Sequence, residues 1–345
     1  MPKNIVVFSD GTGQEGGEGH DTNIYKLFNM IDDRSPKQVA FYDPGLGTGW
    51  RKLTGNVAGA GISTNILQCY EFIFEHFESG DQIFLMGFSR GAATVRSLSS
   101  FIHHFGILPK SRPELIERAY KIYKIDDADE RKTKAGEFVD RHHNMWTRIK
   151  FLGCYDTVAA LGSPFEAVST LLNSIPGLGH KFHNFTLSES VENGDQALAI
   201  DDERRTFHPI LWDAQAKDYQ KIRQVWFAGM HTDVGGGYEE QNLSDIPLAW
   251  MTQRAVAHGL LLYPRHGVEI REDADGRMHD SRGSMIAKLY RREARSWPVG
   301  RSDKPVIHES VLRRKKNRAN EDNPPYRPWI VSLDHEVEPW VRHSP

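Results

Sequence analysis

The sequence has few cysteines and almost no excess of charge. Cys69 and Cys154 are its only two cysteines, and they form no C-x-x-C motif or Cys/His cluster, which argues against a disulfide framework and a zinc site. With 43 Lys and Arg against 46 Asp and Glu, the net charge of −3 does not suit a dedicated nucleic-acid binder. We therefore expect no metal and no nucleic-acid partner.

Long apolar runs are also missing. No stretch approaches the roughly 20 residues that cross a membrane, and the N-terminal residues 1–8 become polar too soon for a signal peptide. The expectation is a cytoplasmic protein, with export by a specialised secretion machine left open. Apolar residues still make up 39% of the chain, enough for the large core of a globular protein.

The phosphate- and dinucleotide-binding motifs that would indicate a cofactor are absent or incomplete. There is no Walker A string, and the glycine-rich segment 45–49 is followed by Trp50, which breaks the G-x-G-x-x-G spacing. The Ser-Asp-Gly-Thr segment 9–12 resembles part of a haloacid-dehalogenase motif, but Phe8 stands where that motif needs aspartate. We therefore expect no cofactor.

What the sequence does contain is an alternation of short apolar runs and helical stretches. Continuous apolar strands separated by helices favour a mostly parallel sheet with helices on both faces. Active sites of such sheets lie at the carboxyl ends of the strands. The strands are expected at residues 5–8, 39–42, 82–86, 149–155 and 225–228, and the helices at 62–77, 91–105 and from Pro247 to Val256.

The length of the chain suits one elaborated domain, 1–345, better than two full domains. Its core is expected over about 4–260. A charged helical stretch at about 113–145 and a Leu-, Ile-, Phe-, Gly- and Pro-rich stretch at about 163–185 are predicted to be insertions. The polar C-terminal extension, about 267–345, has no clear periodicity, and its fold is not predicted.

A G-x-S-x-G motif, Gly87–Gly91, follows a buried-looking strand and precedes a helix of small residues. That setting is typical of a nucleophile elbow, in which Ser89 is the nucleophile. The turn is tight, and Cβ atoms on either side of the serine would clash. The alternative is a glycine-rich turn with a capping serine.

Asp156 and His231 each follow an apolar strand, as Ser89 does. Asp156 could orient a catalytic histidine or simply cap a turn. His231 is followed by three glycines, at 235–237, which suit a bent loop that places an imidazole over the serine. Because the order Ser, Asp, His along the chain belongs to α/β-hydrolases, we predict a Ser89–Asp156–His231 triad on an α/β-hydrolase fold.

The triad predicts an acyl-enzyme mechanism, which needs an oxyanion hole. One donor is expected to be the backbone N–H of Arg90, the residue after the nucleophile. The second is expected from the loop after the first strand, at Gly11 or Thr12. The alternative for that loop is an Asx turn that ends the strand.

Several side chains are candidates for substrate contact. Asp233 could hold the glycine loop by bonds to backbone groups, or ligate a cation together with Asp10. Leu171, Leu172 and Phe182 could form a lid or an acyl pocket, or ordinary core.

Basic residues raise the question of contact with phosphate or a membrane. Arg90, Arg204 and Arg205 could bind a phosphate head group, or form structural ion pairs. The basic run 313–316 could be a solvated face, or could touch an anionic membrane surface. Peripheral membrane contact is therefore left open.

Several blocks of the sequence resemble the type VI secretion phospholipase-effector-like catalytic domain family. The resemblance covers roughly residues 4–260 and implies an α/β-hydrolase fold, an acyl-ester or lipid substrate, and the same triad. The blocks are Phe8–Thr12, Gly87–Gly91, Phe151–Val158, Ala197–Phe207 and Phe227–Gly237.

Two other functions remain as alternatives to a lipid or phospholipid esterase. One is a small-ester or thioester hydrolase that uses the same triad. The other is a hydrolase scaffold used only for binding, which a missing triad residue would favour. The sequence does not define the oligomeric state.

Overall fold

The computed structural model describes residues 2–11, 20–45, 56–158, 186–214, 216–283, 285, 287–317 and 325–342, with only the backbone described at 56–60. Five features predicted from the sequence lie wholly outside these ranges. They are Thr12, Leu171, Leu172, Phe182 and the insertion at 163–185.

The centre of the molecule is a sheet of eight strands, and every pairing between them is parallel. Their order across the sheet is β2-β1-β3-β4-β5-β6-β7-β8. This architecture confirms the predicted α/β-hydrolase fold class. The strands are β1 Asn4–Ser9, β2 Gln38–Asp43, β3 Gln82–Phe88, β4 Ile149–Tyr155, β5 Asn193–Ala199, β6 Lys221–Phe227, β7 Val306–His308 and β8 Glu336–Glu338.

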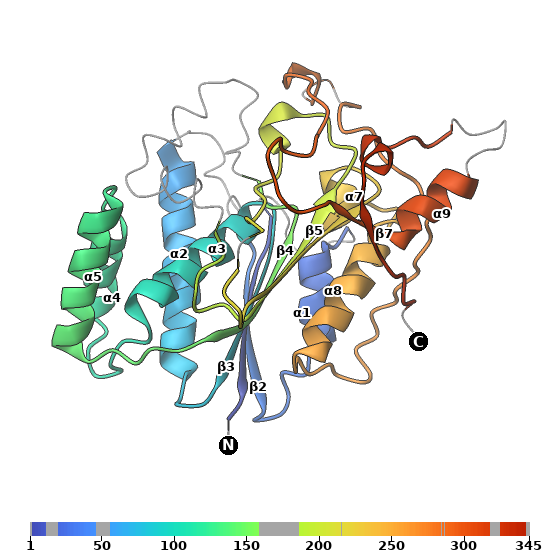
Figure 1. The fold of residues 1–345 in the computed structure, drawn as a ribbon. Coiled ribbons are helices and arrows are strands. Elements are labelled where there is room, and N and C mark those ends of the chain that lie inside the picture. Colours follow the sequence, from blue (N-terminus) through green and yellow to red (C-terminus); the bar gives the residue numbers. More distant parts are fainter. Residues whose placement is uncertain are drawn as a thin grey trace.

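Helices cover both faces of the sheet (Figure 1). Helices α1 and α8 pack on one face, whereas α2 and α3 pack on the other, with α4 and α5 outside them. The helices are α1 Asn23–Met30, α2 Asn56–His76, α3 Arg90–Phe105, α4 Leu115–Tyr123, α5 Ala128–His142, α7 His231–Gly235, α8 Asp245–Ala257 and α9 Glu309–Asn317, with short 3₁₀ turns η1 Arg205–Phe207, η2 Ala287–Leu289 and η3 Trp329–Ser332.

The alternation of side chains along β1 explains why the sheet has two cores. Val6 and Phe8 pack into the core that also contains the buried side chains of α1 and α8. Ile5 and Val7 point the other way, into the core shared with α2 and α3. Successive residues of a strand face opposite sides, so a strand buried on both sides must be apolar throughout.

The parallel strands place their carboxyl ends along one edge of the sheet, which we call the catalytic edge. In Figure 1 this edge is at the top, opposite the N-terminus of the chain. Among the described helices, none is both long enough and apolar enough to cross a membrane.

Candidate active site

Ser89 lies at the turn between β3 and α3, in a strained conformation. Its φ angle of 58° is in the left-handed region, which costs energy for a residue with a side chain. The two glycines of the motif are required by close packing. A Cβ atom on Gly87 would lie 2.5 Å from the Gly91 carbonyl oxygen, and one on Gly91 would lie 2.0 Å from that of Ser9. The turn therefore has the geometry of a nucleophile elbow.

The structure brings the three predicted triad residues into one hydrogen-bonded chain. His231 Nε2 lies 2.8 Å from Ser89 Oγ, and His231 Nδ1 lies 2.6 Å from Asp156 Oδ2. All three side chains are buried. An ionised carboxylate can only accept hydrogen bonds, so Nδ1 carries the proton and Nε2 accepts from the serine hydroxyl.

Asp156 occupies an unusual backbone position directly after β4. Its φ angle is 40°, and its N–H donates to the Ala197 carbonyl of the neighbouring strand at 2.8 Å. Its carboxylate also accepts the Ala199 N–H, at 3.0 Å. The carboxylate is thus fixed between two strand ends, at the point where it meets the imidazole.

A buried arginine that the sequence analysis did not single out holds the outer side of Asp156. The two Nη atoms of Arg295 donate to the two carboxylate oxygens at 2.7 and 2.8 Å. They also donate to the carbonyls of Ala199 and Phe207, each at 2.5 Å. Arg295 is only 2% exposed, and it comes from the C-terminal extension, 139 residues after Asp156.

Opposing effects set the ionisation of Asp156. Burial by itself would raise the pKa of this carboxyl, but the charge and hydrogen bonds of Arg295, together with the bond to His231, lower its pKa below the usual range. The Asp156 carboxylate is therefore ionised throughout the physiological pH range.

The imidazole of His231 is held by aromatic rings on two sides. Its centroid lies 4.7 Å from the Phe88 ring and 5.1 Å from the Phe207 ring, the latter in an edge-on arrangement. Its backbone N–H donates to Asp202 Oδ2 at 3.2 Å. Asp202 is in turn paired with Arg204 at 2.6 Å. Arg204 therefore forms an ion pair here, as one of the two sequence interpretations proposed.

Asp233 links the glycine loop after His231 to the C-terminal extension by hydrogen bonds. One carboxylate oxygen accepts the backbone N–H groups of Met230 and His279, both at 3.0 Å. The other lies 2.6 Å from the His279 ring, which stacks on Tyr238 with centroids 3.8 Å apart. These contacts match the predicted bonds to backbone groups. Among the described residues, no group of three or more His, Cys, Asp or Glu is placed to hold a metal ion.

The two expected donors of an oxyanion hole differ in their surroundings. Arg90 is the first residue of α3, where a backbone N–H has no partner within the helix. Gly11 lies beside the serine, because a Cβ atom built on it would be 3.7 Å from Ser89 Cβ. The Gly11 N–H, however, donates to Asp10 Oδ1 at 2.6 Å, so it is engaged within its own turn.

Asp10 is a buried carboxyl whose hydrogen bonds stay within the protein. Besides the Gly11 amide, it accepts the hydroxyls of Thr22 and Tyr42 at 2.5 and 2.7 Å. Burial raises the pKa of Asp10 to about 6, although these hydrogen bonds oppose that rise. Asp10 therefore fixes the loop next to the serine and is only 1% exposed.

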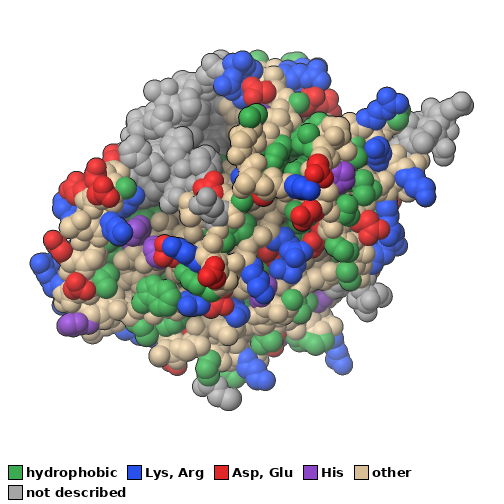
Figure 2. All heavy atoms as spheres, in the orientation of Figure 1, with side chains coloured by type: hydrophobic (Ala, Val, Ile, Leu, Met, Phe, Trp, Pro, Cys, Tyr) green, Lys and Arg blue, Asp and Glu red, His purple; other side chains and the backbone are tan. Residues whose placement is uncertain are grey.

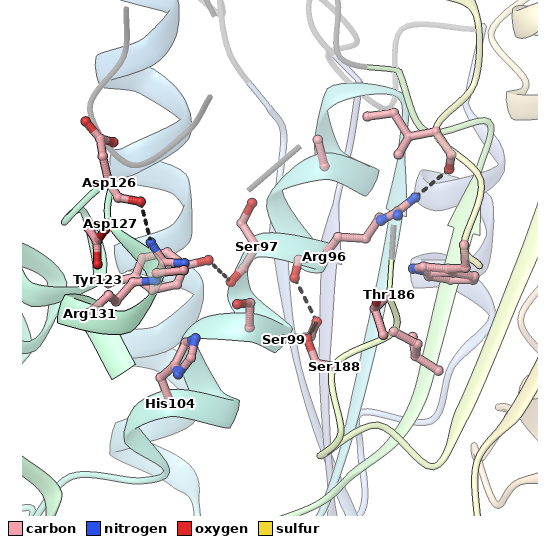
Figure 3. Close-up of a pocket in the computed structure, with 16 residues that line it drawn as sticks. Arg96, Ser97, Ser99, His104, Tyr123, Asp126, Asp127, Arg131, Thr186 and Ser188 are labelled. Atoms are coloured by element: carbon pink, nitrogen blue, oxygen red, sulfur yellow. Dashed lines mark hydrogen bonds between the residues drawn. The ribbon is translucent and has the colours of Figure 1, made fainter. Parts of the chain in front are cut away.

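A cavity of about 510 Å³ lies along α3, but none of the three triad residues lines it. Figure 3 shows Arg96 and Ser99 of α3 on one side of this cavity and Arg131 of α5 on the other. Arg96 donates to the Ile210 carbonyl and Arg131 to the Ile125 carbonyl, each at 2.6 Å. Both guanidinium groups are therefore already engaged with the protein's own backbone.

Comparisons with known proteins return relatives of low similarity. The uncharacterized protein YEL023C of Saccharomyces cerevisiae is 31% identical over 185 residues, which are 46% of this chain and 27% of that protein. The chain thus spans about a quarter of the length of that curated relative.

Two solved structures are among those to which the chain shows a weak likeness. The Tle1 effector bound to the VgrG spike of the type 6 secretion system is 20% identical and has a TM-score of 0.33, covering 69% of this chain and 51% of that one. A thermophilic esterase of Thermogutta terrifontis, with butyrate bound, is 13% identical and has a TM-score of 0.41, covering 76% and 86%.

A family model gives the decisive match. It covers residues 3–254, which include every residue of the Ser89–His231–Asp156 chain but not Arg295 or His279. The match spans well over half of the chain and agrees with the resemblance seen in the sequence blocks. The protein belongs to the family described as T6SS phospholipase effector Tle1-like, catalytic domain.

Proposed function

We infer that the protein is a serine hydrolase that cleaves carboxylic esters through an acyl-enzyme on Ser89. The observation that carries this proposal is the hydrogen-bonded chain from Ser89 Oγ through His231 to Asp156, with separations of 2.8 and 2.6 Å. The strained serine at the strand–helix turn is a second support, because such backbone strain is found at functional sites.

The first half-reaction follows from this geometry. As Ser89 Oγ attacks the acyl carbon, its proton passes to His231 Nε2, and Asp156 stabilises the imidazolium that forms. The tetrahedral intermediate then collapses, the bond to the leaving oxygen breaks, and that oxygen takes the proton from Nε2. The products of this step are an alcohol and an ester of Ser89.

Water completes the cycle by the same proton route. His231 Nε2 removes a proton from water, the hydroxide attacks the acyl carbon, and the ester bond to Ser89 Oγ breaks as Oγ regains the proton. The Arg90 backbone N–H is the expected oxyanion donor, and each such donor contributes about 3 kcal/mol to transition-state stabilisation. The second donor is expected from the loop after β1, at Gly11 or Thr12, and the Gly11 amide would have to leave Asp10 to serve.

The substrate proposed here is a lipid or phospholipid ester. Family membership supports it, since the family is described by phospholipase effectors. Arg90 adds a local support. Arg90 directly follows Ser89 in the chain. Its side chain is partly buried and has no carboxylate partner among the described residues, and burial lowers its pKa to about 10. A phosphodiester is the kind of anion that such a donor binds well.

The test is hydrolysis of a p-nitrophenyl ester and of a phospholipid by wild type and by Ser89→Ala. We expect Ser89→Ala to lose at least about 10³-fold of the activity on both substrates. Wild type should also react covalently with a fluorophosphonate, whereas Ser89→Ala should not. Activity that survives Ser89→Ala would exclude the proposed nucleophile, and a folded wild type that neither hydrolyses nor labels would favour a binding scaffold.

A further inference from the structure

A segment of the C-terminal extension crosses the catalytic edge, and we call it the strap. It spans residues 277–295, of which all but 284 and 286 are described. Its inner side holds the site: Arg295 binds Asp156, and His279 binds Asp233. Tyr290 packs edge-on against Phe207 with centroids 5.6 Å apart, and Phe207 contacts His231. The strap therefore contacts Asp156 directly and reaches His231 through Phe207.

The outer side of the strap exposes apolar side chains. Met285 is 84% exposed and Leu289 is 62% exposed, although large apolar side chains are usually covered. Between them, Lys288 is exposed and has no acidic partner among the described residues.

Basic side chains accompany the exposed apolar ones on the strap. Its sequence contains six Lys and Arg and two Asp and Glu, but three of the six basic side chains pair with acids elsewhere in the chain. They are Arg277, Arg292 and Arg295, paired with Glu240, Glu203 and Asp156. Arg291 is exposed and follows Leu289 by two residues. In Figure 2, Lys and Arg side chains lie among Asp and Glu side chains at the top of the molecule, where Figure 1 places this segment in orange.

Exposed apolar side chains next to exposed basic ones suit one kind of partner. An anionic phospholipid surface attracts Lys and Arg and accepts apolar side chains at its interface. A second protein copy would need roughly 800 Å² on each partner, far more than two side chains offer. The strap that carries these side chains also contacts the site, since Arg295 binds Asp156 and Tyr290 packs on Phe207 beside His231.

We propose that the outer face of the strap, with Met285, Leu289, Lys288 and Arg291, docks the protein onto anionic phospholipid membranes. This proposal rests on the proposed function, because it gives the lipid esterase access to its substrate. It also names the residues that would make the peripheral membrane contact left open by the sequence.

The test is co-sedimentation with vesicles, carried out in the Ser89→Ala background so that the lipid stays intact. One set of vesicles contains equal phosphatidylglycerol and phosphatidylcholine, and the other contains phosphatidylcholine alone. We expect binding to the anionic vesicles to be at least about tenfold tighter, and to weaken when the salt is raised to about 0.5 M.

Two double variants locate the docking face. Met285→Asp with Leu289→Asp, and separately Lys288→Glu with Arg291→Glu, should each weaken binding at least about tenfold. The matched control is Val256→Asp, which also changes an exposed apolar residue, 42% exposed on α8, and should bind within about twofold of the parent. Circular dichroism checks that each variant is folded.

The outcomes separate docking from catalysis. When Ser89 is intact, both double variants should hydrolyse a soluble short-chain ester as wild type does. Their activity on anionic vesicles should be lost. Equal binding to both kinds of vesicle, or double variants that bind like Val256→Asp, would overturn the docking proposal. The proposal would also be overturned if wild type formed a dimer and the variant with Met285→Asp and Leu289→Asp were monomeric. Binding as expected without any ester hydrolysis would remove only the proposed function.

Discussion

At the scale of single residues, Arg295 favours the ionised form of Asp156, the proposed triad acid. Its bidentate contact with Asp156 lies in the interior, and removing one partner of a buried pair leaves the other charge uncompensated. We expect Arg295→Met to lower the free energy of unfolding by about 3–5 kcal/mol at neutral pH. Urea denaturation measures this loss, and Arg295→Lys should retain part of the stability.

The same substitution should change the pH dependence of activity. Without Arg295, burial is no longer offset, so the pKa of Asp156 rises. The acidic limb of the kcat/KM profile on a soluble ester should then move to higher pH in Arg295→Met, and less so in Arg295→Lys. A profile that keeps its position while only stability falls would mean that Arg295 supports the fold alone.

Asp10 gives a prediction about stability and pH. Burial raises its pKa from 3.8 to about 6 in the folded protein, so the folded state holds a proton that the unfolded state releases between about pH 4 and 6. Stability therefore falls as the pH rises through this window, and the full cost, roughly 3 kcal/mol, is present above pH 6.

Asp10→Asn removes this titration while keeping an acceptor for the Gly11 amide. The change in the free energy of unfolding from pH 4.5 to pH 7 should be more positive in Asp10→Asn than in wild type, because only wild type loses stability by ionising Asp10. Urea denaturation at the two pH values gives both differences, and contributions from other buried acids cancel in the comparison. Identical pH differences in the two proteins would contradict the raised pKa of Asp10.

At the scale of elements, the turn between β3 and α3 tolerates no side chain at Gly91. A Cβ atom there would meet the backbone of Ser9 and Asp10, and backbone atoms cannot move aside as a flexible side chain can. We expect Gly91→Ala to cost about 3 kcal/mol or more of stability.

The matched control lies on another helix. Gly136, inside α5, has open space where a Cβ atom would be, so Gly136→Ala should stabilise the protein by about 0.5–1 kcal/mol. Thermal or urea denaturation of the two variants compares the positions directly. If both variants shift stability in the same direction, the close packing at the elbow is not what requires Gly91.

The elements found from the sequence are those with a continuous apolar pattern. The strand expected at 149–155 is β4, whereas β5 was not predicted as a strand because polar residues occupy it. Asp195 and Gln196 are buried there, where Arg254 binds Asp195 at 2.6 Å and Gln196 donates to the Ile210 carbonyl at 3.1 Å. Such pairings join distant parts of the chain, so no local pattern indicates them.

The residues of the site also differ in whether a local sequence pattern indicates them. Ser89, Asp156 and His231 were singled out because each follows an apolar strand, and the structure brings them together. Arg295 follows no strand and belongs to a segment without periodicity. Its role depends on a fold in which the chain returns to Asp156, which a spacing rule cannot express. The only signal in the sequence is an arginine that could pair with an acid, and many other arginines of the chain carry the same signal.

At the scale of the whole molecule, the C-terminal extension is part of the fold although the family match ends at residue 254. β7 and β8 extend the sheet beyond β6, so that β6 is not an edge strand. Trp226 of β6 is 1% exposed because Trp297 and Trp329 pack edge-on against it, with centroids 6.5 and 5.6 Å away. The extension therefore covers both the β6 edge of the sheet and the buried side chain of Trp226.

These contacts predict the result of a truncation. A chain that ends at residue 266 keeps the proposed triad but loses Arg295, β7, β8 and the cover of Trp226, so it should expose an apolar edge and a buried tryptophan. We expect it to aggregate or to unfold without cooperativity, with strong binding of an apolar dye and no ester hydrolysis. Co-expression of residues 267–345 as a separate chain should recover soluble, active protein in part, because the lost contacts are noncovalent. A truncated chain that unfolds cooperatively and hydrolyses esters at the wild-type rate would show that the family-matched region folds alone, and that Arg295 is dispensable for the site.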